Sequence, residues 1–256
     1  MRVLMTGAAG AIGSCLRAGL REELDELRLS DVREVADLAH GETFVAADVT
    51  DAAAVDRAMD GVDAVIHLGA VPDEAAFEIL AGPNLHGAFH VFDAARRLGV
   101  RRVIYASSNR ISGFEPTARR LSGGEAPRPD GLYGATKAWG EALGRLYHDR
   151  FGLEVVCVRI GSFEAEPSDP RHLFTWLSHG DAVRLFRACL TAPDVGYACV
   201  YGASANARGW WDLEPARALG YAPADDAERY ADRFPGAEAG EVQGGEFTAP
   251  GYGGWA

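Results

Sequence analysis

The sequence predicts an α/β fold in which a doubly wound parallel sheet is covered by helices, with a small C-terminal cap. Two observations lead to this prediction. Short apolar runs alternate with helical segments, which is the pattern of repeated βαβ units. In addition, a glycine-rich turn from Gly7 to Gly13 follows the first apolar run and opens the first helix. A turn of this kind between a strand and a helix is typical of a Rossmann-type domain.

Six strands and four helices are expected before residue 162. The strands are expected at 2–6, 27–30, 43–47, 64–68, 102–106 and 155–160. The helices are expected at 14–24, 52–59, 84–98 and 133–151. Gly99 and Gly152 directly follow the last two helices, where a glycine commonly caps a helix C-terminus.

The pattern changes after residue 161. A helix is expected at 181–192, a strand at 198–201, and a short helix opened by Trp210–Asp212. From Gly236 onward the chain is rich in glycine, proline and aromatics, a composition that allows an ordered arm or disorder. We therefore expect a dinucleotide-binding domain over 1–162. Residues 163–256 are expected to form a small substrate cap and tail within the same compact unit.

Composition narrows the class of protein. The chain has 256 residues, of which 48% are hydrophobic and 24% charged, as in an ordinary globular protein. The net charge of −12 argues against nucleic acid or an anionic membrane as a partner, although a small acidic substrate remains possible. No apolar run reaches the ~20 residues that span a bilayer. The four cysteines form no C-x-x-C pair and are expected to be reduced thiols in a cytoplasmic protein.

The glycine turn is expected to hold a dinucleotide. Gly7 allows the tight turn, Gly10 lets the backbone approach a pyrophosphate, and Gly13 permits close packing of helix on strand. The amides of Ala11 and Ile12 then face the phosphates at the helix N-terminus, where the helix dipole favours anions. A glycine turn without a ligand is the alternative, and the strand–turn–helix context argues against it.

The ends of the next strands complete the expected cofactor site. Asp31 can accept hydrogen bonds from the adenosine ribose and would repel a 2′-phosphate, so NAD is favoured over NADP. Arg33 is the counter-argument, since it could meet such a phosphate. Asp48 and Val49 are placed to meet the adenine, although Asp48 could equally cap a turn. Leu68-Gly69-Ala70 offers small residues past which a cofactor can run closely.

A proton-transfer pair is expected on the helix at 133–151. Tyr133 and Lys137 are four residues apart, so they share one helix face and can point into one pocket. A free phenol has a pKa of about 10, and a nearby ammonium is expected to lower it toward the range of a general base. A chance match on a surface helix is the alternative. The upstream Ser107-Ser108-Asn109 and the glycine turn favour the functional interpretation.

These motifs together resemble the short-chain dehydrogenase/reductase superfamily, in its extended or epimerase-like branch. Within that branch the chain is similar to uronate dehydrogenases over almost its whole length. The segments that carry this similarity are 106–109, 128–134, 158–162, 175–179, 201–206, 209–212 and 243–245.

The resemblance implies oxidation of a hexuronate, such as galacturonate or glucuronate, at C1, with NAD accepting the hydride and an aldarolactone as first product. It implies that Tyr133 takes the hydroxyl proton, that Lys137 assists it, and that Ser108 bonds the reacting oxygen. Asn109, Ser162 and Arg171 would hold the sugar. An Arg171 fork matches a carboxylate bidentately.

Two positions depart from the uronate enzymes. Arg110 stands where they usually have a histidine, and Pro72 where they have a serine. The substrate could therefore be another acidic sugar, including a sugar phosphate. A nucleotide-sugar epimerase or dehydratase is the second alternative, and a non-catalytic dinucleotide sensor is the third. The short C-terminal part argues against the second, and the intact Tyr133/Lys137 pair against the third. A homo-oligomer is expected from the resemblance.

The expected site can be stated in full. The catalytic residues are Ser108, Tyr133 and Lys137. The NAD-binding residues are Gly7, Gly10, Ala11, Ile12, Gly13, Asp31, Val32, Asp48, Val49, Leu68, Gly69, Ala70, Asn84, Tyr133, Lys137 and Ile160. The substrate-binding residues are Ser108, Asn109, Arg110, Tyr133, Ser162 and Arg171. No metal site is expected, because no histidine pair has a third ligand at zinc spacing.

Overall fold

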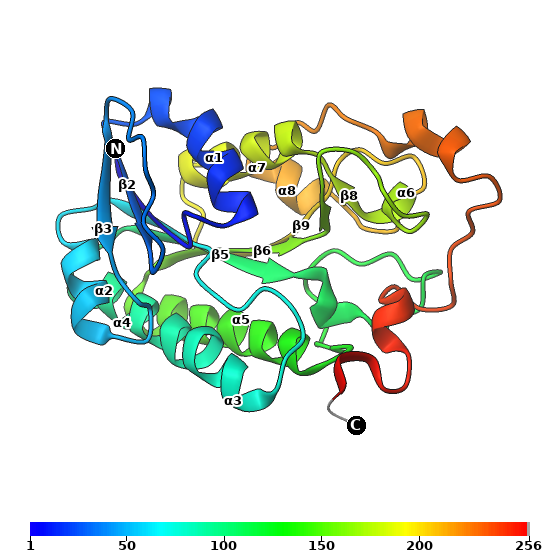
Figure 1. The fold of residues 1–256 in the computed structure, drawn as a ribbon, viewed down its shortest axis with the longest axis horizontal. Helices are drawn as coiled ribbons and strands as arrows, with labels where there is room; N and C mark the ends of the chain where they lie inside the picture. Colours follow the sequence, from blue (N-terminus) through cyan, green and yellow to red (C-terminus); the bar gives the residue numbers. More distant parts are fainter. Residues whose placement is uncertain (255–256) are drawn as a thin grey trace.

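A seven-stranded parallel sheet runs through the centre of the molecule (Figure 1), as seen in a computed structural model that describes residues 1–254. The strands are β1 Arg2–Thr6, β2 Glu26–Asp31, β3 Glu42–Ala46, β4 Ala64–His67, β5 Arg102–Ser108, β6 Glu154–Ile160 and β9 Tyr197–Gly202. Their order in the sheet is β3-β2-β1-β4-β5-β6-β9. The doubly wound α/β prediction is confirmed.

Helices cover both faces of this sheet. The longer ones are α1 Ala11–Leu20, α2 Ala52–Met59, α4 Ala88–Arg97, α5 Leu132–Phe151 and α7 His179–Thr191. Helices α1 and α7 pack together on one face, and α2, α4 and α5 lie on the other (Figure 1). Each layer has its own apolar core, one built around Leu16 and Phe186 and the other around Phe92 and Leu143.

The order of strands reverses at β1, which creates the opening for a ligand. β1 pairs with β2 on one side and with β4 on the other, in parallel register from Val3↔Leu27 and Val3↔Ala64. The connections therefore leave in opposite directions at the carboxyl ends of these strands. Crevices at such a switch point are where doubly wound sheets bind their ligands.

The segment after residue 162 takes part in the sheet itself. β9 pairs with β6 in parallel, with Cys157 opposite Cys199, and Val200 and Tyr201 are fully buried. We expected a strand at 198–201 within a cap, but it is the seventh strand of the main sheet. Pairing with β9 satisfies the outer backbone groups of β6, which would otherwise form an exposed edge.

Three predicted elements have different limits. The first helix begins at Ala11, because the turn already ends there. The helix expected at 84–98 is preceded by α3 Phe77–Leu80 and a wider π-helical stretch, η2 Ala81–Gly87, which contains Pro83. Proline has no amide hydrogen, so a regular α-helical ladder cannot run through it.

The short helix expected at Trp210 begins instead at Glu214, as α8 Glu214–Ala218. Trp210 and Trp211 are buried in a third apolar cluster with Phe174 and Tyr201. Neither residue lies in a helix, and Trp211 forms a bridge with Leu121. Packing of the two indoles therefore overrides the local helical tendency.

The remaining elements are short. They are β7 Ser162–Phe163, α6 His172–Thr175, β8 Trp176–Leu177, and the 3-10 turns η1 Arg21–Glu23, η3 Asn109–Ser112, η4 Ala227–Arg233, η5 Gly245–Thr248 and η6 Tyr252–Gly254. The C-terminal arm, residues 242–254, lies alongside the loop that precedes α5 (Figure 1). Among the residues described, no helix is long and apolar enough to cross a membrane.

Candidate active site

The carboxyl ends of the strands open into one continuous cleft. It consists of a cavity of about 670 Å³ over β1–β4 and a cavity of about 390 Å³ over β5 and β6. Five residues line both parts and show that they are connected. These are Ile12, Leu68, Ala70, Pro72 and Phe163. We call the larger part the cofactor half and the smaller part the sugar half.

Backbone atoms shape the cofactor half at the glycine turn. Gly7 has a φ of +70°, and a Cβ there would lie 2.7 Å from the amide nitrogen of Gly69. A Cβ on Gly13 would lie 2.6 Å from the carbonyl oxygen of Ala8. Helix α1 then starts after Gly10 with no side chain capping its first amides. These free amides at a helix N-terminus fit a pyrophosphate.

Asp31 ends β2 and lines the cofactor half. Its carboxylate accepts hydrogen bonds of 3.0 Å from the amides of Ala9 and Arg33, which fixes its direction. Arg33 is largely exposed and donates to the carbonyl oxygen of Ala9 at 2.8 Å. The free amides at the start of α1 and the carboxylate of Asp31 fit the pyrophosphate and a ribose of NAD. Val32, Asp48 and Val49 also line this half, as expected from the sequence.

Ser108, Tyr133 and Lys137 meet in the sugar half, next to the cofactor half. Ser108 ends β5, and the other two residues occupy the first two turns of α5. The Lys137 ammonium donates to the carbonyl oxygen of Ala106 at 2.9 Å and lies 5.6 Å from the centre of the Tyr133 ring. The predicted face-sharing of the pair is therefore present, and both side chains are buried.

Burial dominates the acid–base properties of this pair. It raises the pKa of the Tyr133 phenol to about 12, although hydrogen bonding with Ser108 and the charge of Arg110 act in the opposite direction. Burial also lowers the pKa of Lys137 to about 8. We expected the ammonium to bring the phenol pKa down. In the chain alone the pKa of the phenol rises instead, because a phenolate loses its hydration inside the protein.

Arg171 brings a further positive charge to the sugar half. Its Nε and Nη2 atoms both donate to the backbone carbonyl oxygen of Gln243, at 2.9 and 2.7 Å. Within residues 1–254 it forms no ion pair with a carboxylate. Burial lowers its pKa to about 10, so it is a cation at neutral pH. Ser162 lies in the same half and shares a 2.8 Å hydrogen bond with Thr175.

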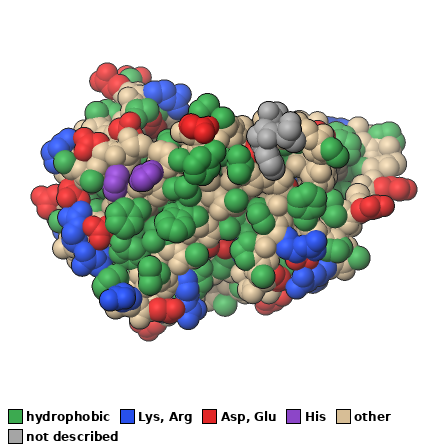
Figure 2. All heavy atoms as spheres, turned by 90° about the horizontal axis from the view of Figure 1, so that it is seen from below, with side chains coloured by type: hydrophobic (Ala, Val, Ile, Leu, Met, Phe, Trp, Pro, Cys, Tyr) green, Lys and Arg blue, Asp and Glu red, His purple; other side chains and the backbone are tan. Residues whose placement is uncertain are grey.

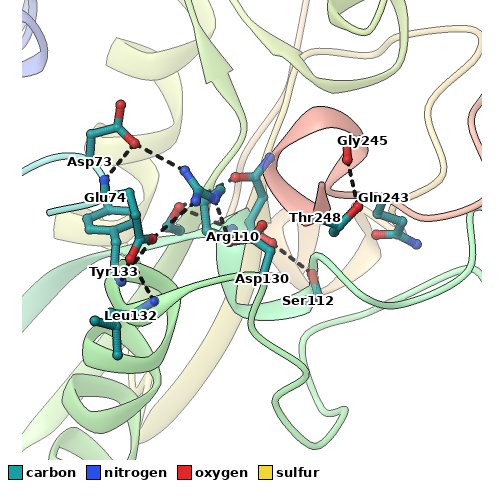
Figure 3. A network of polar contacts seen from close by, with 12 residues as sticks. Asp73, Glu74, Arg110, Ser112, Asp130, Leu132, Tyr133, Gln243, Gly245 and Thr248 are labelled. Atoms are coloured by element: carbon teal, nitrogen blue, oxygen red, sulfur yellow. Dashed lines mark hydrogen bonds and ion pairs between the residues drawn. The ribbon is translucent and has the colours of Figure 1, made fainter. Parts of the chain in front are cut away.

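Arg110 also lines the sugar half, but its charge is already neutralised (Figure 3). Its guanidinium donates to Asp130 at 2.5 Å, to Asp73 at 3.2 Å and to Glu74 at 3.4 Å. The side chain is almost fully buried. Asn109 precedes it and accepts a 3.4 Å hydrogen bond from Ser108.

One expected residue lies outside the cleft, and several others were missed. Asn84 lines neither half; it bonds both backbone groups of Val71 and the hydroxyl of Thr136, so it holds the loop after β4 against α5. Phe247 lines the sugar half, and Gln243 holds Arg171, yet neither role was predicted. Both come from the arm, whose composition carries no periodic signal. Their only indication was the 243–245 segment of the resemblance.

No group of three or more His, Cys, Asp or Glu side chains that could hold a metal ion occurs in the part of the chain that is described.

The comparisons with known proteins agree with this geometry. The family model of the NAD dependent epimerase/dehydratase family matches residues 3–196. A uronate dehydrogenase of Pseudomonas putida is 44% identical, over 98% of this chain and 96% of its own. An NAD-dependent glucose-6-phosphate dehydrogenase of Haloferax volcanii is 41% identical, over 89% and 95%. Among solved structures, a mutant uronate dehydrogenase of Agrobacterium tumefaciens complexed with NAD has a TM-score of 0.91, with 39% identity over 97% of each chain.

Proposed function

Since this chain belongs to the NAD dependent epimerase/dehydratase family, we propose that it is an NAD-dependent dehydrogenase that oxidises C1 of a free hexuronate, such as galacturonate or glucuronate, to the aldarolactone. The similarity to uronate dehydrogenases covers nearly the full length of both proteins. It includes the part of the chain after residue 196, which supplies Gln243 and Phe247 to the sugar half.

The charge and position of Arg171 are the main support for an acidic sugar as the substrate. Arg171 is a cation of the sugar half that forms no ion pair with a carboxylate within the described chain, and two of its nitrogens are held by a backbone oxygen. A partly buried cation without an ion pair favours an anionic ligand, and a guanidinium fork fits a carboxylate. The substrate carboxylate is the counter-ion that we assign to it.

A sugar phosphate fits the same pocket less well. A phosphate carries close to two negative charges at neutral pH, and Arg110, the other arginine of the sugar half, is already surrounded by Asp73, Glu74 and Asp130. The one charge of the Arg171 guanidinium matches one carboxylate. A nucleotide sugar needs still more room than the sugar half of about 390 Å³ provides.

The residues then divide the chemistry as follows. Tyr133 takes the proton of the C1 hydroxyl, and Ser108 donates a hydrogen bond to the same oxygen as it becomes a carbonyl. Lys137 holds a positive charge beside the phenol and is itself held by Ala106. Bound NAD supplies the hydride acceptor and a positive charge that favours the phenolate. Asn109 and Ser162 hold the sugar, and Arg171 fixes its carboxylate, so that C1 faces Tyr133.

The test is NADH formation, followed at 340 nm, with a panel of sugars. The panel contains galacturonate, glucuronate, galactose, glucose 6-phosphate and UDP-glucuronate. We expect rapid turnover with a free uronate only. Reduction with glucose 6-phosphate alone, or consumption of UDP-glucuronate without net NADH, would contradict the proposal.

Arg171→Gln sharpens this test. Hydrogen bonds to charged groups contribute about 1.5–3 kcal/mol, so kcat/KM for the uronate should fall roughly 10- to 150-fold. The rate with galactose, which has no carboxylate, should not fall with it. Arg128→Gln is the matched control, because Arg128 is half exposed and pairs only distantly with Glu115. Equal losses on both sugars would show that Arg171 does not read the carboxylate.

We also propose that the enzyme forms a homo-oligomer through the outer face of α3, α4 and α5. Large apolar side chains are exposed there, and Figure 2 shows hydrophobic side chains gathered across this face. They include Phe77, Phe89, Trp139 and Leu146, each between 44% and 51% exposed. Phe77, Phe89 and Trp139 line an apolar groove of about 460 Å³ on this face. A second copy placed across a twofold axis covers both grooves with the same residues.

Light scattering measures this assembly directly. The wild-type protein should have at least twice the chain mass of 27.3 kDa, and Trp139→Glu should reduce it toward one chain. Leu38→Glu is the control, because Leu38 is equally exposed but lies in the loop between β2 and β3. A monomeric wild-type protein, or an unchanged mass in Trp139→Glu, would overturn the assignment of this face.

The four cysteines support a cytoplasmic location, which we propose as the site of action. All four are unpaired, including Cys157 and Cys199, which stand opposite each other on neighbouring strands. Proteins of reducing compartments keep such thiols free. Cell fractionation tests the location, and recovery of the enzyme outside the cytoplasmic fraction would contradict it.

A further inference from the structure

Arg110 links three segments that are distant in the sequence. Its Nε atom contacts Asp130, just before α5, and its Nη atoms contact Asp73 and Glu74 in the loop after β4. The central carbon of its guanidinium lies 4.0 Å from the centre of the Phe247 ring and 5.3 Å from that of Tyr252. Both rings belong to the C-terminal arm. Figure 3 shows Arg110 at the centre of this network.

Glu74 connects this network to the catalytic helix. The N-cap position of α5 is Gly131, which has no side chain to accept the first amides. The Glu74 carboxylate takes that role and accepts hydrogen bonds from the amides of Leu132 at 2.8 Å and Tyr133 at 3.2 Å. A Cβ on Gly131 would collide with Glu74 at 2.2 Å. The backbone of the catalytic tyrosine is thus held by a carboxylate that Arg110 contacts.

The arm is anchored on its other side by Gln243. Its side chain donates to the carbonyl oxygens of Pro116 and Arg119 and accepts from the indole of Trp211. From this anchor the arm reaches Phe247, which lines the sugar half and lies 5.5 Å from the guanidinium of Arg171. Phe247 is therefore held between two arginines, and it forms one wall of the sugar half.

We propose that Arg110 is a positioning residue that fastens the C-terminal arm over the sugar half and, through Glu74, holds Tyr133 in line with it. Only the expected effects on turnover rest on the proposed function. Arg110 needs no contact with substrate in this role, because its fork is taken by carboxylates and its faces by aromatic rings. In this role, the arginine that stands in place of the usual histidine changes how the C-terminal arm closes the sugar half.

The composition of the network supports positioning over simple stabilisation. Three carboxylates share one guanidinium, and one oxygen of Asp130 is buried without a hydrogen-bond partner among the described residues. Burying charges in this way contributes little to stability compared with apolar packing, and it is best attested where it specifies one arrangement. The arrangement specified here is contact of the arm with the loop before α5: a Cβ on Gly244 would lie 3.1 Å from that same Asp130 oxygen.

The test compares Arg110→Met with Arg128→Met. Arg128 is the matched control, because it lies in the same loop before α5, is half exposed, and forms its one ion pair within the described chain with Glu115 and not with Glu74. Hydrogen exchange, read by mass spectrometry, should accelerate in two peptides of Arg110→Met, 131–137 and 242–252, and in neither peptide of Arg128→Met. This readout needs no substrate, so it stands even if the uronate assignment fails.

The kinetic readout separates positioning from cofactor binding. In Arg110→Met we expect kcat for the uronate to fall about 10- to 100-fold through misplacement of Tyr133, while the Kd of NAD stays within about 2-fold because Arg110 does not line the cofactor half. Arg110→Lys keeps the charge but lacks the fork and the flat face, so it should recover only part of kcat.

Unchanged exchange in peptide 131–137 together with a normal kcat in Arg110→Met would overturn the proposal. If Arg110→Met does not fold, Phe247→Leu and Tyr252→Leu test the same connection from the arm. Both should loosen the arm and lower kcat while the protein stays folded. A loosened arm with unchanged kcat and unchanged KM for the uronate in those variants would also overturn it.

Discussion

The two halves of the cleft are built in different ways. The cofactor half is formed largely by backbone and small residues near the ends of neighbouring strands, with Gly7, Gly13 and Asp31 within one βαβ unit. The sugar half is formed by side chains from segments spread between Ile12 and Phe247. The first half depends on local chain geometry, whereas the second depends on ion pairs and contacts across long sequence distances.

This difference explains which changes each half tolerates. A backbone-built site fails when a side chain is added where there is no room for it. A side-chain-built site fails when one charged or aromatic group is removed. Tyr133 and Lys137 line the sugar half and sit close to the cofactor half, so they are sensitive to both.

Removing the phenol where the two halves meet should have the largest effect. We expect Tyr133→Phe to lower kcat at least ~100-fold by removing the group that takes the proton, with little change in the Kd of NAD. Tyr147→Phe is the matched control, since Tyr147 is a buried tyrosine of the same helix that bonds Asp93 and lies away from the cleft. Steady-state rates at 340 nm decide the point, and near-normal turnover of Tyr133→Phe would remove the mechanism.

A methyl group on the glycine turn should damage the cofactor half. Gly7→Ala meets both the left-handed φ of +70° and backbone atoms 2.7 Å away. We expect the free energy of unfolding to fall by roughly 2–4 kcal/mol and NAD to bind more weakly.

Gly41→Ala isolates the steric part of that effect. Gly41 has a φ of +80° with nothing within 4 Å of a Cβ, so only the backbone strain of about 1 kcal/mol should appear. Thermal unfolding measures both variants. Equal losses in the free energy of unfolding would show that the close approach of Gly69 to Gly7 does not affect stability.

Cofactor choice should respond more mildly to a change at Asp31. Asp31→Asn removes the negative charge that would face a 2′-phosphate and leaves exposed Arg33 beside it. Two unit charges 4 Å apart interact by about 1 kcal/mol in bulk water and about 4 kcal/mol near a protein surface, so the ratio of kcat/KM for NADP to that for NAD should rise at least about 5-fold. Asp56→Asn on α2 is the control. An unchanged ratio would show that Asp31 does not select the cofactor.

The smallest predicted effect is the shift that burial causes in the pKa of Lys137. Lys137 is the only lysine of the chain, so ¹³C-labelled lysine gives one side-chain NMR signal. Its pKa should be about 8, below the ordinary 10.5, because burial disfavours the ammonium. The folded state binds this proton less tightly than the unfolded state. Its destabilising contribution is therefore complete below pH 8 and fades as the pH rises from about 8 to 10.5. A measured pKa at or above 10.5 would contradict this account.

Much of the cofactor half was predictable from the sequence because its determinants are local. The glycine spacing, the alternation of strands and helices, and the i,i+4 pair of Tyr133 and Lys137 are each properties of short segments. They predicted six strands, the turn and the shared helix face, which the fold confirms.

The sequence by itself therefore determined the doubly wound sheet, the nucleotide turn and the Tyr133/Lys137 pair, since backbone geometry follows from residue types a few positions apart. Only the tertiary structure decided that β9 joins the sheet, that burial raises the phenol pKa, and that Arg110 is ion-paired while Arg171 is held by a backbone carbonyl oxygen. The reason is physical. Burial, ion pairing and capping by Glu74 depend on which distant segments become neighbours in space. A pattern of residue types along the chain does not show which segments these are.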